Sequence, residues 1–315
     1  MTNVAPLDGV VVAGWSPVGL DPAFADLVPE TARLQRLASG AAWAEGPTWL
    51  PDGSVLWSDI PNDRVLRWSP SGGPDVFLAP AGFQNGRTID LDGGILACSH
   101  GDRRVERLGL DGTRTALVDR YHGARLNSPN DLVVKSDGTV WFTDPPYGII
   151  SDYEGHKGDS EIGDCLVFRF DPATGELEAV SDWVEEPNGI AFSPDESLLY
   201  VADTSAAKRV DGSGNHHIVV FDVVSGRQLA NPRVFYVTEP GLADGFRLDE
   251  QGNLFTSAGD GIHVVAPDGR LLGRLPVPEE VSNCVFGGPA GTRLFITAST
   301  SLYAIDLTTH GAPRP

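Results

Sequence analysis

Cysteine is scarce in this chain of 315 residues: there are three, Cys98, Cys165 and Cys284, and none lies in a C-x-x-C motif. An odd number of widely separated cysteines excludes a disulfide scaffold and a cysteine-rich zinc site, and it is typical of a reducing compartment. The segment Met1–Leu20 has no basic region and no apolar run longer than Val10–Val12. We therefore expect no signal peptide and a cytoplasmic protein.

Positive charge is also scarce, with 23 Lys and Arg against 43 Asp and Glu and a net charge of −20. A nucleic-acid-binding protein needs a basic surface, which this composition hardly provides. An anionic membrane surface is disfavoured for the same reason, and no apolar run approaches the length of a bilayer span. We expect a small-molecule partner, with no nucleic acid and no membrane. The sequence carries no indication of the oligomeric state.

Long stretches rich in Leu, Ala, Lys and Glu are absent, and a single Met stands against 37 Gly and 24 Pro. This balance argues against a helical protein and predicts many short strands joined by turns. Hydrophobic residues make up 41% of the chain, enough for a sizeable core. The length fits one large all-β domain or two average ones.

An internal repeat decides between these options. Six segments align, each with an acid or amide at its second position, which we call the anchor. The anchors are Glu45, Asn85, Asn130, Asn188, Asp244 and Asn283, at intervals of 39 to 58 residues. Eight residues after the anchors lie Gly53, Gly93, Gly138, Glu196, Gly252 and Gly291. Glycine suits a tight turn with positive φ, and an apolar β-rich run such as VLWSD or TVWFTD follows each turn.

Further apolar runs provide a third strand in every repeat and a fourth strand in the first five. Four strands per unit at this period describe the blades of a propeller. We predict an all-β fold, a six-bladed β-propeller with four-stranded antiparallel blades.

The sixth repeat lacks its fourth strand, because only ten residues, two of them proline, remain after Ile305. We expect an N-terminal strand from Ala32–Leu37 to close the ring and remove an exposed edge. The predicted organisation is an irregular N-terminal arm at 1–31, a single propeller domain at 32–307 and a C-terminal tail at 308–315.

The anchors begin the innermost strand of each blade, so they should surround one mouth of the central channel. The loops that join second and third strands return to the same mouth, whereas the glycine turns point to the opposite face. Two of these loops are extended, at about 145–164 and 204–216. We expect them to form a lid or a substrate-selecting rim.

Oxygen-bearing side chains around one mouth indicate a metal site. Glu45 and Asp244 would repel each other unless a cation or a shared proton relieves them. Carboxylate and amide oxygens favour Ca²⁺ or Mg²⁺, with Mn²⁺ as an alternative and Zn²⁺ less suited to this set of ligands. The competing interpretation is that Asn and Asp at strand starts simply cap turns. Six anchors in register, including a glutamate, favour metal binding.

Several motifs together resemble the gluconolactonase/regucalcin-like (SMP-30) lactonases and, more distantly, diisopropyl-fluorophosphatase. They are AEGPTW around Glu45, RLNSPNDLVV around Asn130, FTDPPYG from Phe142, EPNGIAFSPD around Asn188 and ADGFRLDEQGNL around Asp244. The resemblance covers about Ala42 to Leu307. It implies a six-bladed propeller that hydrolyses sugar lactones such as glucono-1,5-lactone.

The resemblance also implies one divalent cation, Ca²⁺ first, held by Glu45, Asn188 and Asp244, with Asn130 as a fourth ligand. Asp244 is implied as general base or activator of water, although contact with a cation would make it a weaker base. The chemistry fits independently, since lactone hydrolysis needs a polarised carbonyl and a delivered water.

Four further residues are predicted to bind substrate. Arg125 and Asn127 precede Asn130, and Arg125 either orients the substrate or pairs with a surface acid. His100 follows a second strand and is either a proton shuttle or a turn histidine. Tyr147 either stacks on a sugar ring or packs in the core. Asn85 and Asn283 should line the pocket without binding metal, and Trp43 and Trp49 should lie in the core.

Three functions remain open at this point: a metal-dependent lactonase, a phosphotriester or organophosphate hydrolase on the same metal cradle, and a non-catalytic propeller scaffold. A serine hydrolase is excluded by the absence of a G-x-S-x-G motif, and neither a P-loop nor a dinucleotide fingerprint is present.

Overall fold

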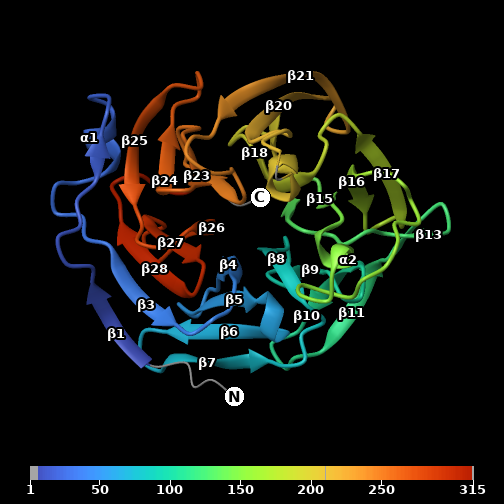
Figure 1. Cartoon of the computed structure of the whole chain (residues 1–315), viewed down its shortest axis with the longest axis horizontal. Helices are drawn as coiled ribbons and strands as arrows, with labels where there is room; N and C mark the ends of the chain where they lie inside the picture. The colour runs from blue at the N-terminus through green and yellow to red at the C-terminus, as the bar shows by residue number, and fades with distance from the viewer. Residues whose placement is uncertain (1–5, 210, 314–315) are drawn as a thin grey trace.

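The computed structural model describes residues 6–209 and 211–313 and forms a six-bladed β-propeller, as predicted (Figure 1). Each blade is an antiparallel sheet whose strands follow one another in sequence. Blade 1 contains β4 (Ala44–Trp49), β5 (Val55–Asp59), β6 (Arg64–Ser69) and β7 (Gly73–Leu78). Blade 2 contains β8 (Gln84–Ile89), β9 (Ile95–Ser99), β10 (Arg104–Leu108) and β11 (Arg114–Val118). Blade 3 contains β14 (Leu132–Val134), β15 (Val140–Asp144), β16 (Leu166–Asp171) and β17 (Glu176–Ser181).

The second half of the ring is built in the same way. Blade 4 contains β18 (Pro187–Phe192), β19 (Leu198–Asp203), β20 (His217–Val224) and β21 (Gln228–Val237). Blade 5 contains β22 (Phe246–Leu248), β23 (Leu254–Ala258), β24 (Gly261–Val265) and β25 (Leu271–Pro276). Blade 6 contains β26 (Val281–Gly287), β27 (Arg293–Ala298) and β28 (Ser301–Asp306). The innermost strands β4, β8, β14, β18, β22 and β26 contact one another in a closed circle around the central channel.

The ring is closed by an N-terminal strand, as expected. Strand β3 (Gln35–Ser39) pairs antiparallel with β28, and Arg36 lies opposite Tyr303. The observed strand begins three residues after the predicted start at Ala32. Closure satisfies the outer edge of β28, which would otherwise expose unpaired backbone groups.

The segment before β3 is more regular than the predicted arm. Strand β1 (Pro6–Val11) pairs with the outer edge of β3, and β2 (Val18–Gly19) pairs with β25. A short helix, α1 (Phe24–Leu27), packs Phe24 into the core of blades 5 and 6. An open strand edge attracts further backbone pairing, which explains why the segment adds strands to two blades.

The glycine turns have the predicted conformation. Residues Gly53, Gly93, Gly138, Glu196, Gly252 and Gly291 all have positive φ. Glu196 is the one residue of these six that is not glycine, and its φ of 57° is strained for a residue with a side chain. Its carboxylate accepts hydrogen bonds from Ser136 N (2.7 Å) and Lys135 Nζ (3.0 Å) of blade 3. These contacts compensate for the strain and fasten two blades together.

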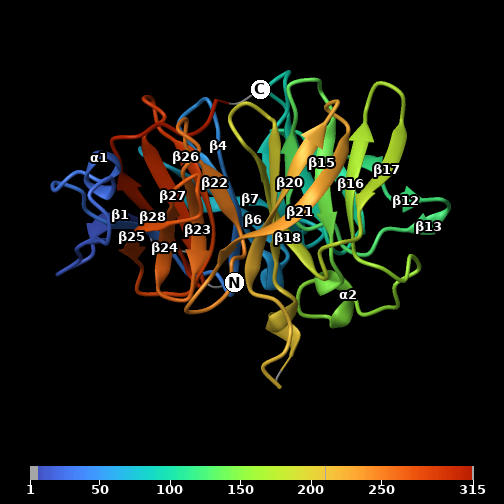
Figure 2. The ribbon, with the colours of Figure 1, turned by 90° about the horizontal axis from the view of Figure 1, so that it is seen from above.

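Short elements at the blade ends complete the fold. They are the hairpin β12 (Arg120–Tyr121) and β13 (Ala124–Arg125), helix α2 (Tyr147–Ile150) and the 3₁₀ turns η1 (Ile60–Asn62) and η2 (Ser205–Lys208). Figure 2 shows α2 and the loop after β19 projecting from one end of the propeller, with the C-terminus at the other. In the described part of the chain, no helix is long and apolar enough to span a bilayer.

Candidate active site

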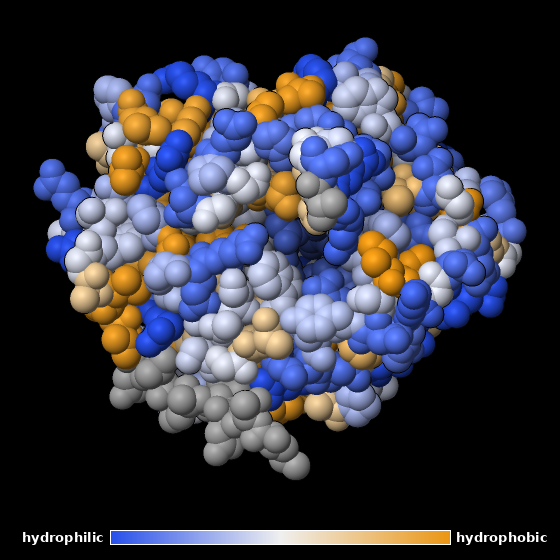
Figure 3. All heavy atoms as spheres, viewed as in Figure 1, coloured by the Kyte–Doolittle hydropathy of each residue, from blue (hydrophilic) through white to orange (hydrophobic). Residues whose placement is uncertain are grey.

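A cavity of about 280 Å³ opens at the mouth where the inner strands begin. Its lining includes five of the six anchors: Glu45, Asn85, Asn130, Asn188 and Asp244. Figure 3 shows a hollow near the centre of this face, with hydrophilic side chains at its margin. The fold therefore brings the four predicted metal ligands together from blades 1, 3, 4 and 5.

Glycines next to the anchors explain how the inner strands come this close. Four anchors are followed by glycine: Gly46, Gly86, Gly189 and Gly245. A Cβ atom on Gly189 would lie 2.3 Å from the Asp244 carbonyl oxygen, and one on Gly46 would lie 2.0 Å from the Asn85 carbonyl oxygen. The Gly189 N–H instead donates to the Asp244 carbonyl at 3.0 Å. An acid or amide followed by glycine therefore recurs in four of the six repeats. This pair is a sequence signal that the inner strands approach one another closely, in addition to the position of the anchors.

Four carboxylates line the cavity, and two of them, Glu45 and Asp244, have no positive partner within salt-bridge distance among the described residues. Glu45 is 2% exposed, and Oε2 accepts hydrogen bonds from Gly46 N (2.7 Å) and Asn283 Nδ2 (3.3 Å). Burial raises the pKa of Glu45 to about 7, in spite of the Gly46 N–H. Burial, followed by the charge of Glu45, raises the pKa of Asp244 well above its ordinary value. Among the described residues, no hydrogen bond reaches the Asp244 carboxylate.

Among the described residues, three amide anchors, Asn85, Asn130 and Asn188, have a side-chain oxygen that accepts no hydrogen bond, and Asn283 does not. Asn188 Nδ2 donates to Thr204 Oγ1 at 3.1 Å, and its Oδ1 accepts no hydrogen bond within residues 6–209 and 211–313. Asn130 has the same freedom, since no side-chain bond engages it there. Asn283 uses both ends of its amide, because Oδ1 accepts from Cys284 N (2.8 Å) and Nδ2 donates to Glu45. Asn85 Nδ2 lies 3.4 Å from His100 Nε2.

This donor set fits a hard divalent cation. Two carboxylates and two free amide oxygens are the ligands that Ca²⁺ prefers, and a cation would remove the repulsion between Glu45 and Asp244. The described residues hold no group of three or more His, Cys, Asp and Glu side chains arranged for a metal. A zinc site built from such residues is therefore not seen there, and the candidate ligands remain a mixture of acids and amides.

The extended loops supply residues that sequence reasoning did not single out. Glu154 comes from the loop after β15, and Lys208 comes from η2 after β19. Burial raises the pKa of Glu154, against the opposing charge of Lys208. Lys208 Nζ lies 5.1 Å from the centre of the Tyr147 ring. Both extended loops reach the mouth of the channel, as predicted. Their length in the sequence indicated that they could contribute side chains to the cavity, but not which ones.

The four predicted substrate-binding residues occupy different places. Tyr147 lines the cavity, and its hydroxyl pairs with Thr204 Oγ1. His100 is fully buried behind the lining, with Nδ1 3.1 Å from the Glu154 carbonyl oxygen, and burial lowers its pKa to about 4. A neutral His100 thus links the Asn85 side chain to the Glu154 loop.

Arg125 and Asn127 lie outside the cavity lining. Asn127 is buried and uses its amide in hydrogen bonds to the carbonyls of Asp144 (3.0 Å) and Asp164 (2.8 Å). Arg125 lies in β13, and its backbone N–H donates to Glu161. Both residues therefore hold the loop before Asn130 in place. Trp43, expected in the core, is partly exposed and lines the cavity.

Comparisons with known proteins show the family to which the chain is similar. Residues 43–300 match the family described as SMP-30/Gluconolactonase/LRE-like region. The chain is 36% identical over 301 residues to a gluconolactonase of Zymomonas mobilis, which covers 88% of this chain and 82% of that one. It is 32% identical over 265 residues to a pentonolactonase of Haloferax volcanii, which covers 81% of each. The solved structure of a gluconolactonase from Xanthomonas campestris is 39% identical, has a TM-score of 0.89 and covers 98% of this chain and 99% of its own.

Proposed function

The chain belongs to the SMP-30/gluconolactonase/LRE-like family, in agreement with its motifs, and from this premise we propose that it is a divalent-cation-dependent lactonase. The proposed substrates are sugar lactones such as glucono-1,5-lactone, which hydrolysis opens to the aldonate. The observation that carries the proposal is the pair of uncompensated carboxylates, Glu45 and Asp244, beside free amide oxygens in one cavity. A cytoplasmic location stays a prediction based on three free cysteines.

The proposed cation ligands are Glu45, Asn130, Asn188 and Asp244, and the expected ion is Ca²⁺, with Mg²⁺, Mn²⁺ or Zn²⁺ as alternatives. When bound, the cation supplies a Lewis acid that polarises the lactone carbonyl and stabilises the negative charge that develops on its oxygen. The hydrogen bond from Asn188 Nδ2 to Thr204 fixes which end of that amide is left to face the cavity.

Asp244 is the proposed proton acceptor for the attacking water. Its carboxylate has no hydrogen-bond donor among the described residues, and burial raises its pKa well above the ordinary value. A bound cation lowers this pKa and makes Asp244 a weaker base, so the proposed role rests on its free carboxylate oxygens and not on the raised pKa. Attack forms a bond from the water oxygen to the carbonyl carbon, and the ring C–O bond then breaks as its oxygen takes up a proton.

The rim of the cavity offers groups that suit a hydroxylated ring. Lys208 provides hydrogen-bond donors, Glu154 provides acceptors, and the partly exposed Trp43 provides an apolar face. We propose that these three side chains orient the sugar and that the two loops exclude bulk water above it.

The test is hydrolysis of glucono-1,5-lactone by protein stripped with EDTA and then supplied with Ca²⁺, Mg²⁺, Mn²⁺ or Zn²⁺. We expect activity to disappear on stripping and to return with Ca²⁺ in the wild type and in the control Glu250→Gln, an exposed acid of blade 5. Glu45→Gln should regain none. Activity that survives stripping would contradict the metal site.

A parallel assay with diisopropyl fluorophosphate separates the alternative enzyme class. Preference for the phosphorus ester by orders of magnitude would replace the lactonase proposal. Absence of turnover with every lactone and ion would favour the non-catalytic scaffold.

A further inference from the structure

The opposite end of the central channel holds a second cavity, of about 380 Å³. All six inner strands contribute the residues near their ends to it, just as residues near their starts meet at the candidate active site. The contributions include Thr48, Ile89, Val134, Phe192, Leu248 and Phe286. The volume lies at the lower end of the range of about 300–1,000 Å³ found for small-molecule sites. Its walls are mainly aliphatic and aromatic.

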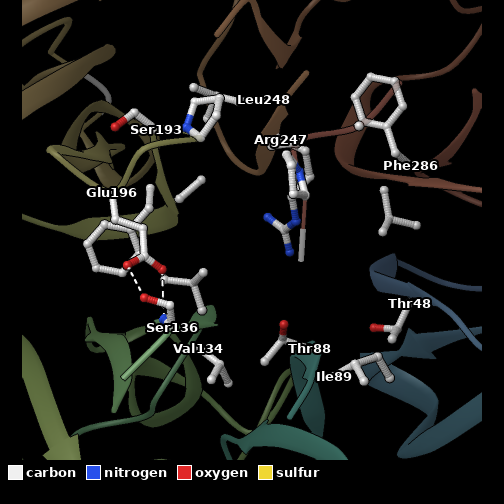
Figure 4. Close-up of a pocket in the computed structure, with 18 of the residues that line it drawn as sticks. Thr48, Thr88, Ile89, Val134, Ser136, Ser193, Glu196, Arg247, Leu248 and Phe286 are labelled. Carbon is white, nitrogen blue, oxygen red and sulfur yellow. Dashed lines mark hydrogen bonds between the residues drawn. The ribbon is translucent and has the colours of Figure 1, made fainter. Parts of the chain in front are cut away.

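One guanidinium points into the middle of this cavity. Arg247 Nη1 donates to the Phe246 carbonyl (2.7 Å) and to Asp131 Oδ2 (3.3 Å). Nε and Nη2 have no hydrogen-bond partner in the described part of the chain, and the side chain is 20% exposed. Figure 4 shows the head of Arg247 between Thr88 and Phe286, and the dashed bonds in that view do not reach it. The free Nε–Nη2 edge is the one that binds a carboxylate with two parallel hydrogen bonds.

A second buried arginine makes this end of the channel more positive. Arg87 is 1% exposed, and its hydrogen-bond acceptors are neutral: Gln84 Oε1, the Gly46 carbonyl (3.1 Å) and Ser58 Oγ (2.6 Å). No carboxylate within salt-bridge distance matches its charge among the residues that the structure describes. Arg247 is paired with Asp131, whereas the charge of Arg87 is opposed only at longer range, by Glu106 and Glu45.

The acids at the rim are already engaged. Glu196 is bound by Ser136 and Lys135, as Figure 4 shows for Ser136. Asp195 accepts hydrogen bonds from the hydroxyls of Ser193 (2.7 Å) and Ser197 (2.8 Å). The two side chains are thus held by their own turns, and Arg247 remains the charged group with free donors.

The C-terminal segment completes the wall. Ala312 N donates to the Leu248 carbonyl at 2.9 Å, and Gly311, Ala312 and Pro313 line the cavity. Three residues of the expected C-terminal tail at 308–315 therefore line this second cavity, and residues 314–315 lie outside the described part of the chain.

We infer that this second cavity binds a small monocarboxylate with a compact apolar body, such as an aliphatic or aromatic acid. The free edge of Arg247 takes the carboxylate, and the aliphatic and aromatic walls take the body. A single two-donor edge suits a monoanion better than a phosphate, which needs more donors to replace its hydration. The site is separate from the candidate active site, so the inference does not depend on the proposed function.

Benzoate is the probe, and methyl-detected NMR of the full chain locates it. We expect shifts at Ile89, Val134 and Leu248 of the second cavity, with Ile60 and Leu242 of the candidate active site unchanged. Benzyl alcohol has the same ring without the charge and should bind at least about tenfold more weakly, since it cannot form the charged pair of hydrogen bonds with Arg247. Shifts confined to Ile60 and Leu242, or none at about 10 mM benzoate, would overturn the inference.

Variants test the chemistry of the same site. Arg247→Gln should weaken benzoate binding at least about tenfold, whereas Arg233→Gln, an exposed arginine of β21 paired with Asp222, should leave it unchanged. Glu45→Gln stripped with EDTA should bind benzoate as the wild type does, because the candidate metal site takes no part. Equal binding by folded Arg247→Gln, or loss of binding on stripping, would contradict the inference. The NMR map of the wild type decides the location even if Arg247→Gln fails to fold.

Discussion

Two of the places where carboxylates are buried treat the charge in opposite ways. Glu106 of β10 is fully buried and accepts hydrogen bonds from Gln84 Nε2 (2.6 Å), Arg104 Nε (2.7 Å) and Arg114 Nε (2.8 Å). Glu45 and Asp244 lie in the candidate active site with amides and backbone around them, and in the part of the chain that the structure describes no arginine is within salt-bridge distance of either.

The difference separates a structural acid from a functional one. A buried ion pair with complete hydrogen bonding is strongly destabilised when one partner is removed, because the other charge is left uncompensated. A buried pair of like charges is destabilising in the empty protein and gains from a bound cation. Four predictions test this contrast, taken in decreasing order of the expected effect.

The largest effect is expected for Asp244→Asn, which should lower kcat for glucono-1,5-lactone by about a thousandfold, about 4 kcal/mol of activation free energy. Calcium titration by calorimetry distinguishes its two roles. Retained calcium binding would assign Asp244 as proton acceptor, and lost binding would assign it as ligand. Activity within a few-fold of the wild type would contradict both roles.

Glu106→Gln should lower the free energy of unfolding by about 3 kcal/mol, because Arg104 and Arg114 lose their buried counter-charge. Urea denaturation measures this loss, and Asp92→Asn, an exposed acid paired with Arg107, serves as the control with a much smaller loss. If Glu106→Gln lowered the free energy of unfolding as little as the control does, the proposed difference between the charge-matched Glu106 and the unmatched Glu45 and Asp244 would be wrong.

Glu45→Gln should have the opposite sign in the absence of metal. The folded pKa of about 7 lies above the usual value of 4.5, so the carboxylate destabilises the fold increasingly as the pH rises from about 4.5 to 7. In EDTA at pH 8 the variant should be more stable than the wild type by about 2 kcal/mol. The gain in stability from the substitution should vanish below pH 4.5, where Glu45 is neutral in the wild type as well. Added calcium should stabilise the wild type but not the Glu45→Gln variant. Destabilisation of the metal-free variant at pH 8 would refute the account.

The smallest effect concerns His100, which links Asn85 to the Glu154 loop. The pKa of His100 is lowered to about 4, so the folded protein keeps the side chain neutral. The stability that the neutral side chain contributes is fully present above its unfolded-state pKa of 6.5. As the pH falls from 7 to 5.5, the wild type should lose about 1 kcal/mol relative to His100→Gln, since unfolding then takes up a proton. Thermal unfolding of both proteins across this range measures the difference, and parallel pH profiles would exclude a buried neutral His100.

The repeat predicted the blades well because it is a local pattern: turn glycines with positive φ, alternating strands and an anchor at each inner strand. The N-terminal segment was predicted less well. Strands β1 and β2 pair with edges that exist only after the ring has closed, so no local pattern marks them. The six anchors were found because each begins a repeat, and the resemblance to a known family singled out Glu45, Asn130, Asn188 and Asp244 among them as candidate ligands.

The residues between repeats were harder to place. Arg125 and Asn127 lie close to Asn130 in sequence, yet the hairpin before β14 directs them to the loop and to Asp144 rather than to the cavity. Glu154 and Lys208 reach the cavity from insertions whose length was visible and whose path was not. Sequence proximity to an anchor is therefore a poor guide to the lining of the mouth.

The sequence by itself determined the number of blades, the closing of the ring and the clustering of the anchors. The reason is that each repeat forms one blade, so residues at the same position of every repeat lie at equivalent positions around the central channel. Only the tertiary structure decided which charges are matched. Glu106 meets two arginines, Glu45 and Asp244 meet each other, and Arg247 is left with a free edge in the second cavity. Charge matching depends on which side chains meet across blades, and that is fixed by packing rather than by the spacing of residues along the chain.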